Sequence, residues 1–237
     1  MDKGDLIRLK TRHVKIAIQV PIKGRSSQRV PNKNFRALQG KPLCHWLLDE
    51  LVGLPEKYDI FIDSEDEAVF AKLQQAGYDR FRFHQREEWF ASDEANGNHM
   101  IHQFAVANPE YDIYAQVYVT AVTLKQAIVE EAIDTLIKDI ANHDSIFLVT
   151  EETGWLWFEG KAINYDPARP NGLKRSQDAV FLQETTGLYA ITKEAVLRTG
   201  CRIGENALPH RVDKQYSIDI DTMEDFRAAE KILSRNQ

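Results

Sequence analysis

Two aspartates near the C-terminus, Asp219 and Asp221, stand two residues apart in the segment SIDIDTMEDF. The isoleucines beside them predict a strand over residues 217–220. The two-residue period of a strand puts both carboxylates on one face, with Cα atoms roughly 6.5 to 7 Å apart. Mg²⁺ is commonly held by one or two carboxylates together with substrate phosphates. We therefore predict that Asp219 and Asp221 hold Mg²⁺ or another divalent cation.

The same segment has a structural alternative. Asp221 or Thr222 could cap the helix predicted over residues 222–233, with acidic residues in its first turn. We assign Asp225 mainly to that capping role. Asp219 has no comparable structural reason, because an aspartate within a strand is unfavourable and is costly to bury without a partner. Metal binding is the favoured interpretation for the pair.

A second cluster lies in the loop PIKGRSSQRVPNKN, residues 21–34, which follows the first predicted strand. It contains four cations, a glycine and two serines: Lys23, Arg25, Arg29, Lys33, Gly24, Ser26 and Ser27. Ligands of open α/β sheets bind at the carboxyl ends of strands, where cations and accessible backbone N–H groups suit a triphosphate. Charge alone would indicate only a solvated basic loop, but the position and composition together favour a polyanion site. The loop matches neither the Walker A pattern nor GxGxxG, which disfavours an ATPase or a dinucleotide site.

The elements that would position these clusters alternate along the chain. Strands are predicted over residues 14–20, 58–63, 81–83, 112–119, 145–150, 187–192 and 217–220. Helices are predicted over residues 42–51, 65–75, 98–107, 124–140 and 222–233. This order predicts a doubly wound α/β fold with a mainly parallel, Rossmann-like sheet and helices on both faces. We expect a tail over residues 1–12 and a single domain over residues 13–237.

Residues 151–185 break the alternation and predict a β-hairpin and loop insertion. The aromatic residues Trp155, Trp157 and Phe158 suit a sheet or a dimer contact better than a ligand site. The insertion could serve an active site or a subunit interface, and the sequence leaves both open.

The overall composition limits the functional classes. The chain has 237 residues, 43% hydrophobic residues and a net charge of −6, which argues against a nucleic-acid-binding surface. No apolar run approaches the roughly 20 residues of a membrane helix, and the first residues are charged. The two cysteines are too few for a disulfide framework. These features predict a cytoplasmic protein without membrane or nucleic-acid partners.

Several motifs, in this order, resemble the cytidylyltransferase family that includes the CMP-sialic acid synthetases and related CMP-ulosonate enzymes. The opening motif at residues 21–34 is similar to P-x-K/R-x-x-S-x-R-V-P-x-K-N and is followed by GKPL at residues 40–43. IDSEDE at 62–67, REEWFASDEANGN at 86–98, KRSQD at 174–178, TTGLYAITKE at 185–194 and IDIDTMEDF at 218–226 also fit. The resemblance covers nearly the whole chain.

The resemblance implies a role for each matching residue. It implies nucleotide binding by Lys23, Gly24, Ser26, Arg29, Lys33, Asn34 and Ser64, of which Lys23 and Arg29 would be catalytic together with Asp219 and Asp221. It also implies that Arg175 and Gln177 contact an acidic sugar, and that the protein is a homodimer. The implied reaction is direct attack of the sugar's anomeric hydroxyl on the α-phosphate of CTP, which gives a CMP-sugar and pyrophosphate. No general base is assigned.

The chain departs from the family pattern where the acceptor is expected. The usual Q-P-T-S-P-L-like segment is replaced by VYVTAVTL at residues 117–124, which leaves the acceptor open. The opening loop is also one residue longer than the common form. A CTP-dependent enzyme acting on a phosphonate or a sugar phosphate is therefore an alternative, and a non-catalytic nucleotide-binding homologue is another.

Overall fold

The computed structural model describes residues 14–24 and 30–234. Seven strands form one sheet in the order β11-β7-β10-β6-β1-β4-β5. They are β1 (Ile16–Pro21), β4 (Tyr58–Ser64), β5 (Arg82–Gln85), β6 (Ile113–Val117), β7 (Ser145–Thr153), β10 (Val180–Thr192) and β11 (Ala207–Arg211). β10 runs antiparallel to its neighbours β6 and β7, while the other six strands are parallel. The predicted mainly parallel sheet is confirmed.

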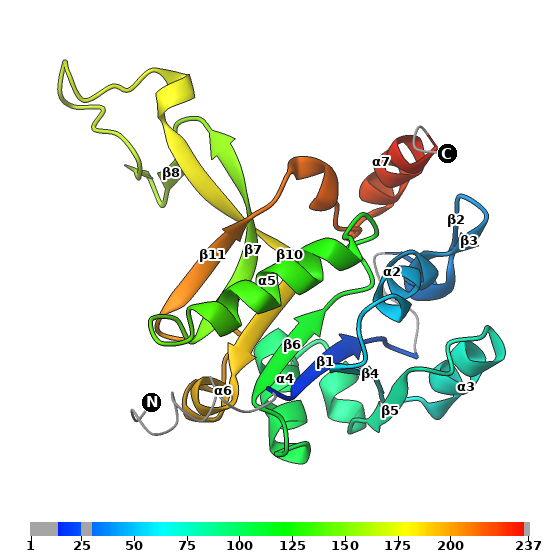
Figure 1. The fold of residues 1–237 in the computed structure, drawn as a ribbon. Helices are drawn as coiled ribbons and strands as arrows, with labels where there is room; N and C mark the ends of the chain where they lie inside the picture. The colour runs from blue at the N-terminus through cyan, green and yellow to red at the C-terminus, as the bar shows by residue number, and fades with distance from the viewer. Residues whose placement is uncertain (1–13, 25–29, 235–237) are drawn as a thin grey trace.

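Helices cover both faces of the sheet, because the strands are apolar on both sides (Figure 1). On one face, Ile16, Ile18 and Val20 of β1 belong to the core that includes α2 (Leu43–Val52), α3 (Glu67–Gln75) and α5 (Gln126–Lys138). On the other face, Ala17 belongs to a core with α4 (Gly97–Ala107) and α6 (Lys193–Thr199). The alternation of β1 thus feeds two cores, as the doubly wound fold requires.

A third, smaller core attaches the last helix, α7 (Met223–Leu233), beside the first part of the chain. Here Phe226 and Leu233 pack with Leu38 of β2 (Ala37–Leu38), which pairs with β3 (Lys41–Pro42). Thr222 and Asp225 form a capping box at the start of α7, which confirms the predicted capping role of Asp225. This packing brings the segment before α7 next to the loop after β1.

The end of β7 and the start of β10 extend past the sheet as a two-stranded arm, which projects away from the body in Figure 1. Between them lies a small hairpin of β8 (Trp157–Phe158) and β9 (Lys161–Ala162), whose turn holds Glu159 and Gly160 at positive φ. The short helix η3 (Ser176–Asp178) precedes β10. The arm falls within residues 151–185, where the insertion was predicted.

The prediction of a strand over residues 217–220 was wrong, since this segment belongs to no sheet. Its backbone N–H groups bond instead to the loop after β6, from Ile220 to the Thr120 carbonyl (3.1 Å) and from Ile218 to Thr123 Oγ1 (3.4 Å). Alternation of polar and apolar residues indicates which side chains face the core. A segment that is hydrogen-bonded along a loop can show the same pattern as a strand in a sheet, so the pattern did not distinguish the two.

Two elements of the last third were not predicted, namely α6 and β11. Pro209 lies inside β11, and a proline is tolerated there because β11 is at the edge of the sheet. The remaining short helices are η1 (Lys33–Phe35), η2 (Glu88–Ala91) and η4 (Lys214–Tyr216). Within residues 14–24 and 30–234, none of the helices has both the length and the apolar character needed to cross a bilayer.

Candidate active site

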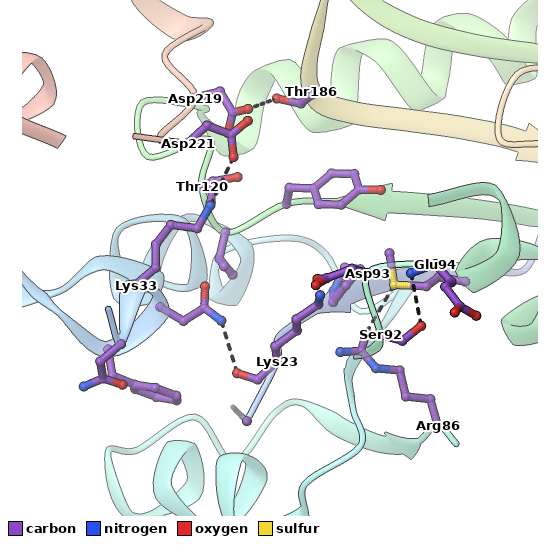
Figure 2. Close-up of a pocket in the computed structure, with 18 of the residues that line it drawn as sticks. Lys23, Lys33, Arg86, Ser92, Asp93, Glu94, Thr120, Thr186, Asp219 and Asp221 are labelled. Atoms are coloured by element: carbon purple, nitrogen blue, oxygen red, sulfur yellow. Dashed lines mark hydrogen bonds and ion pairs between the residues drawn. The ribbon is translucent and has the colours of Figure 1, made fainter. Parts of the chain in front are cut away.

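A cavity of about 830 Å³ opens at the carboxyl ends of β1 and β6. In Figure 2, Asp219, Asp221 and Thr120 lie toward one side with Lys33 below them, and Arg86, Ser92, Asp93 and Glu94 lie toward the other. Lys23 stands between the two groups. The cavity is where an open α/β sheet is expected to bind its ligand.

The two aspartates meet in this cavity, although neither lies on a strand. One carboxylate oxygen of Asp219 accepts a hydrogen bond from the Thr186 hydroxyl. The other, Oδ1, is buried and has no hydrogen-bond partner among the described residues. A buried carboxylate oxygen without a partner is costly, and a cation is the partner that would relieve that cost. The donor set therefore fits a hard divalent cation.

Asp221 joins the acidic pair to the basic loop. Lys33 Nζ lies 3.2 Å from Asp221 Oδ1 and also donates to the Ile220 carbonyl at 2.9 Å. The Lys33 side chain is 13% exposed and that of Asp221 is 46% exposed, so the ammonium group is the more enclosed partner. A cation and two carboxylates at one edge of the cavity can hold a phosphate chain together with its metal.

The loop after β1 contributes the other predicted nucleotide-binding residues. Lys23, Gly24 and Asn34 line the cavity, and Asn34 Nδ2 donates to the Lys23 carbonyl at 3.3 Å. The predicted residues Ser26 and Arg29 lie outside the described residues.

Gly24 also has a structural role that was not predicted. Its N–H donates to Glu65 Oε1 at 2.9 Å, and an added Cβ would collide with the Asp66 side chain. The absence of a side chain therefore allows the loop to pack against the start of α3. In this structure, the glycine N–H is used within the protein.

Beneath the loop lies a buried ionic network that sequence reasoning missed. Arg86 lines the cavity and is 3% exposed. Its guanidinium contacts Glu65 at 2.9 Å and Asp63 at 3.4 Å, and Asp63 also lies 3.0 Å from His84 Nδ1. Burial opposes ionisation of Glu65, but hydrogen bonds to its carboxylate, including that from Arg86, hold its pKa below the ordinary value.

The network continues across the floor of the cavity through two buried glutamines. Gln19 donates to Asp63 at 2.6 Å, and Gln116 donates to Gln19 at 2.8 Å. The signal for them was present in the sequence, because each is a polar residue inside an otherwise apolar strand. Their partners come from different strands, so only the register shows that they form one layer.

Tyr118 extends this polar layer from Gln116 to Arg202 on the opposite wall of the cavity. Its hydroxyl donates to Gln116 Oε1 and accepts a hydrogen bond from Arg202 Nη1 at 3.2 Å. Burial raises the pKa of Tyr118 although Arg202 opposes the shift, so the phenol stays neutral at pH 7. Tyr118 and Thr120 come from the segment in which the chain departs from the family pattern, and both line the cavity. Arg202 and Tyr118 were not predicted as site residues.

Three other predicted residues do not line the cavity. Ser64 is buried, and its hydroxyl accepts a hydrogen bond from the Asp66 N–H, so in this structure it stabilises the turn between β4 and α3. Arg175 lies on the arm, where its exposed side chain pairs with Asp178 at 2.7 Å. Gln177 is exposed in the same short helix.

Known proteins are similar to this chain over most of its length. A family model described as cytidylyltransferase matches residues 22–236. N-acylneuraminate cytidylyltransferase A of Danio rerio is 24% identical to this chain, over 96% of the chain and 52% of its own length. The corresponding protein of Streptococcus agalactiae serotype V is 23% identical, over 84% of the chain and 49% of its own length. The chain thus spans about half the length of these curated relatives.

Solved structures share the fold at low sequence identity. A CMP:2-keto-3-deoxy-manno-octonic acid synthetase, complexed with CTP, superposes with a TM-score of 0.67 and 14% identity over 94% of this chain and 100% of its own. A 4-diphosphocytidyl-2C-methyl-D-erythritol synthase from Anaerococcus prevotii gives a TM-score of 0.68 and 11% identity over 94% of this chain and 97% of its own. These likenesses support the fold, and the match over residues 22–236 shows that the chain belongs to the cytidylyltransferase family.

Proposed function

We propose that this chain transfers CMP from CTP to an acidic sugar of the 3-deoxy-ulosonic acid type, with release of pyrophosphate. The observation that carries the proposal is the unpartnered, buried oxygen of Asp219 beside the Lys33–Asp221 pair. It supports a site for a metal and a phosphate chain in a family whose members are cytidylyltransferases. The named acceptors of the relatives support the choice of an acidic sugar.

In this proposal, the CTP phosphates lie between Lys23 and Lys33, and Asp219 and Asp221 would hold Mg²⁺. A bound divalent cation would neutralise charge on the α-phosphate and on the leaving pyrophosphate. Lys33 would exchange part of its contact with Asp221 for a phosphate oxygen. The nucleoside extends toward Arg86 and Ser92, which lie across Lys23 from the acidic pair in Figure 2.

The reaction is an in-line displacement that the chain promotes by positioning and charge neutralisation. The anomeric hydroxyl oxygen of the acceptor bonds to the α-phosphorus as the bond from that phosphorus to the bridging oxygen breaks. The hydroxyl proton passes to solvent water during this step, and the electron pair of the broken bond leaves with pyrophosphate. No covalent enzyme intermediate is needed.

We also propose that the protein acts as a homodimer through the arm. Trp157 and Phe158 are 57% and 65% exposed in the β8–β9 hairpin of the arm, and large exposed apolar side chains are typical of an interface. Arg175 lies on the same arm and outside the cavity of its own protomer, so any contact of Arg175 with the acceptor requires a second copy.

The direct test is pyrophosphate release from CTP and Mg²⁺ with three groups of acceptors: ulosonic acids, phosphonates and sugar phosphates. We expect turnover with one or more ulosonic acids. Turnover only with phosphonates or only with sugar phosphates would retain the CTP chemistry and contradict the acidic-sugar acceptor. Tight CTP binding without turnover on any acceptor would instead indicate a nucleotide-binding homologue.

A further inference from the structure

Arg202 is an arginine of the cavity wall that no predicted role includes. It lies in the loop between α6 and β11, and its guanidinium stacks on the Tyr189 ring with its carbon 3.7 Å from the ring centroid. Nη1 donates to the Tyr118 hydroxyl at 3.2 Å and Nη2 to Glu184 Oε1 at 3.3 Å. The side chain is 24% exposed and lines the cavity. Arg202 is therefore held in place and open to a ligand.

The order of the strands divides the cavity into two halves. The loops after β1 and β5 carry Lys23 and Arg86, which line the half proposed for the nucleotide. The other half lies over β6 and β10, and it contains Tyr118, Thr186 and Arg202.

The acidic pair lies at the junction between the halves. Asp221 contacts Lys33 on the nucleotide side, and Asp219 bonds to Thr186 of β10 on the other. A group that attacks the α-phosphate has to approach from the half that the nucleotide does not occupy. The acceptor therefore belongs over β6 and β10.

We propose that Arg202 binds the carboxylate of the acceptor, and this assignment rests on the proposed function. A guanidinium has five N–H donors in a planar fork that matches a carboxylate. Among residues 14–24 and 30–234, two side-chain oxygens accept hydrogen bonds from the Arg202 guanidinium, which leaves further N–H donors for a ligand. Glu184 also accepts a hydrogen bond from the Tyr189 hydroxyl. Its carboxylate therefore keeps a partner when its contact with Arg202 is given up. The acceptor carboxylate would then take the place of Glu184.

The surroundings of Arg202 are shaped to admit this arrangement. Gly97, the first residue of α4, is so close that an added Cβ would lie 2.5 Å from the Tyr118 hydroxyl and 2.8 Å from Arg202 Nη1. The Arg202 backbone N–H donates to Asn98 Oδ1 at 3.0 Å, which ties its loop to the same helix. These contacts orient the guanidinium before a ligand arrives, which lowers the entropic cost of binding.

The test compares Arg202→Met with Arg175→Met, because Arg175 is the competing carboxylate ligand. Arg198→Met is the matched control, since Arg198 also forms ion pairs through its guanidinium, with Asp144 and Glu205, but lies outside the cavity lining. Initial rates of pyrophosphate release are measured with an accepted ulosonic acid and with its carboxamide. KM for CTP and the melting temperature are measured for every variant.

We expect Arg202→Met to raise KM for the acid about 100-fold, as the loss of a charge-assisted contact implies. It should change KM for CTP less than about threefold and remove the preference of the enzyme for the acid over the carboxamide. Arg202→Lys should restore part of the preference, because lysine keeps the charge without the fork. Arg198→Met should behave as the unmodified protein.

Other results would overturn the assignment. A selective loss of the acid preference in Arg175→Met alone would transfer the role to the arm. If Arg202→Met raised KM for the acid and for the carboxamide equally and lowered the melting temperature, the role of Arg202 would be structural. Absence of turnover by the unmodified protein on every acceptor would refute the proposed function itself and this assignment with it, and is distinguished by being seen before any substitution is made.

Discussion

The ammonium group of Lys33 lies 3.2 Å from Asp221 Oδ1, across 188 positions of the chain. This contact joins the loop after the first strand to the segment before the last helix. It places the lysine proposed to bind phosphate and the acidic pair at one edge of the cavity, where a metal–triphosphate complex would need both. Three of the four predictions below concern this edge or the network beneath it.

Replacing either aspartate of the pair should stop turnover without unfolding the protein. We expect Asp219→Asn and Asp221→Asn each to lower the rate of pyrophosphate release at least about 1,000-fold, because a charged metal ligand is lost. The melting temperature of Asp219→Asn should not fall, since the substitution removes a carboxylate whose Oδ1 is buried without a hydrogen-bond partner. Mg²⁺ titration of the CTP-bound protein by calorimetry gives an independent readout.

The control for both variants is Asp213→Asn, which alters an exposed aspartate in the same stretch of chain. A normally folded Asp221→Asn protein with full activity would refute the metal assignment.

Lys33→Met should lower the catalytic efficiency of the protein with CTP. The lysine is expected to stabilise phosphate charge in a partly enclosed place, so we expect kcat/KM for CTP to fall roughly 100- to 1,000-fold. A moderate loss of stability should accompany it, because the Ile220 carbonyl and Asp221 both lose a donor. Lys57→Met, which breaks a surface ion pair with Asp134, should leave kcat/KM unchanged. Equal kinetics for the two variants would contradict the role of Lys33.

Stability should depend on pH through Glu65. Its folded pKa lies below the ordinary value of 4.5, so its contribution is complete at neutral pH and is lost as the pH falls below 4.5 and through the folded pKa. We expect Glu65→Gln to lower the free energy of unfolding by about 1–3 kcal/mol at neutral pH, because Arg86 loses an ionised partner. Urea titrations at neutral pH and near pH 3 measure the difference.

The difference in unfolding free energy between Glu65→Gln and the unmodified protein should shrink as the pH falls toward and through the lowered pKa of Glu65, because its carboxylate then takes up a proton. Glu56→Gln, an exposed glutamate, should show little difference at either pH. A gap that stays constant with pH would mean that the charge of Glu65 does not contribute.

The arm should control the oligomeric state. We expect Trp157→Ser combined with Phe158→Ser to shift the protein from dimer to monomer in sedimentation velocity, since two large exposed apolar side chains are removed from the proposed interface. Trp89→Ser is the control, because Trp89 is 44% exposed on the body of the protein. An unmodified protein that is monomeric at micromolar concentration would contradict the proposed dimer.

Much of the site could be predicted from local patterns. The loop of residues 21–34 and the aspartates at 219 and 221 were identified by residue type, spacing and position after a strand, and both reach the cavity. The capping role of Asp225 followed from its position three residues after Thr222 in the sequence. Such features depend on a few neighbouring residues, and local geometry decides them.

Other residues could not be placed in this way. The strand predicted over residues 217–220 is a tethered loop, and Ser64 holds a turn and does not line the cavity. Arg175 carries the charge expected of a carboxylate ligand, but the arm takes it away from the cavity of its own protomer. In these cases the residue types suited the expected roles. Where each side chain lies, however, depends on how the surrounding segment packs.

The sequence by itself determined the alternating α/β order, the basic loop and the acidic pair, because periodicity and spacing act within a few residues of one another. The tertiary structure alone decided that Gln19, Asp63 and Gln116 form one polar layer and that Arg202 meets Tyr118 at its end. The physical reason is that a pattern states which face a side chain occupies, whereas its partner is set by strand order and register. Those depend on the packing of the two cores that the sheet separates.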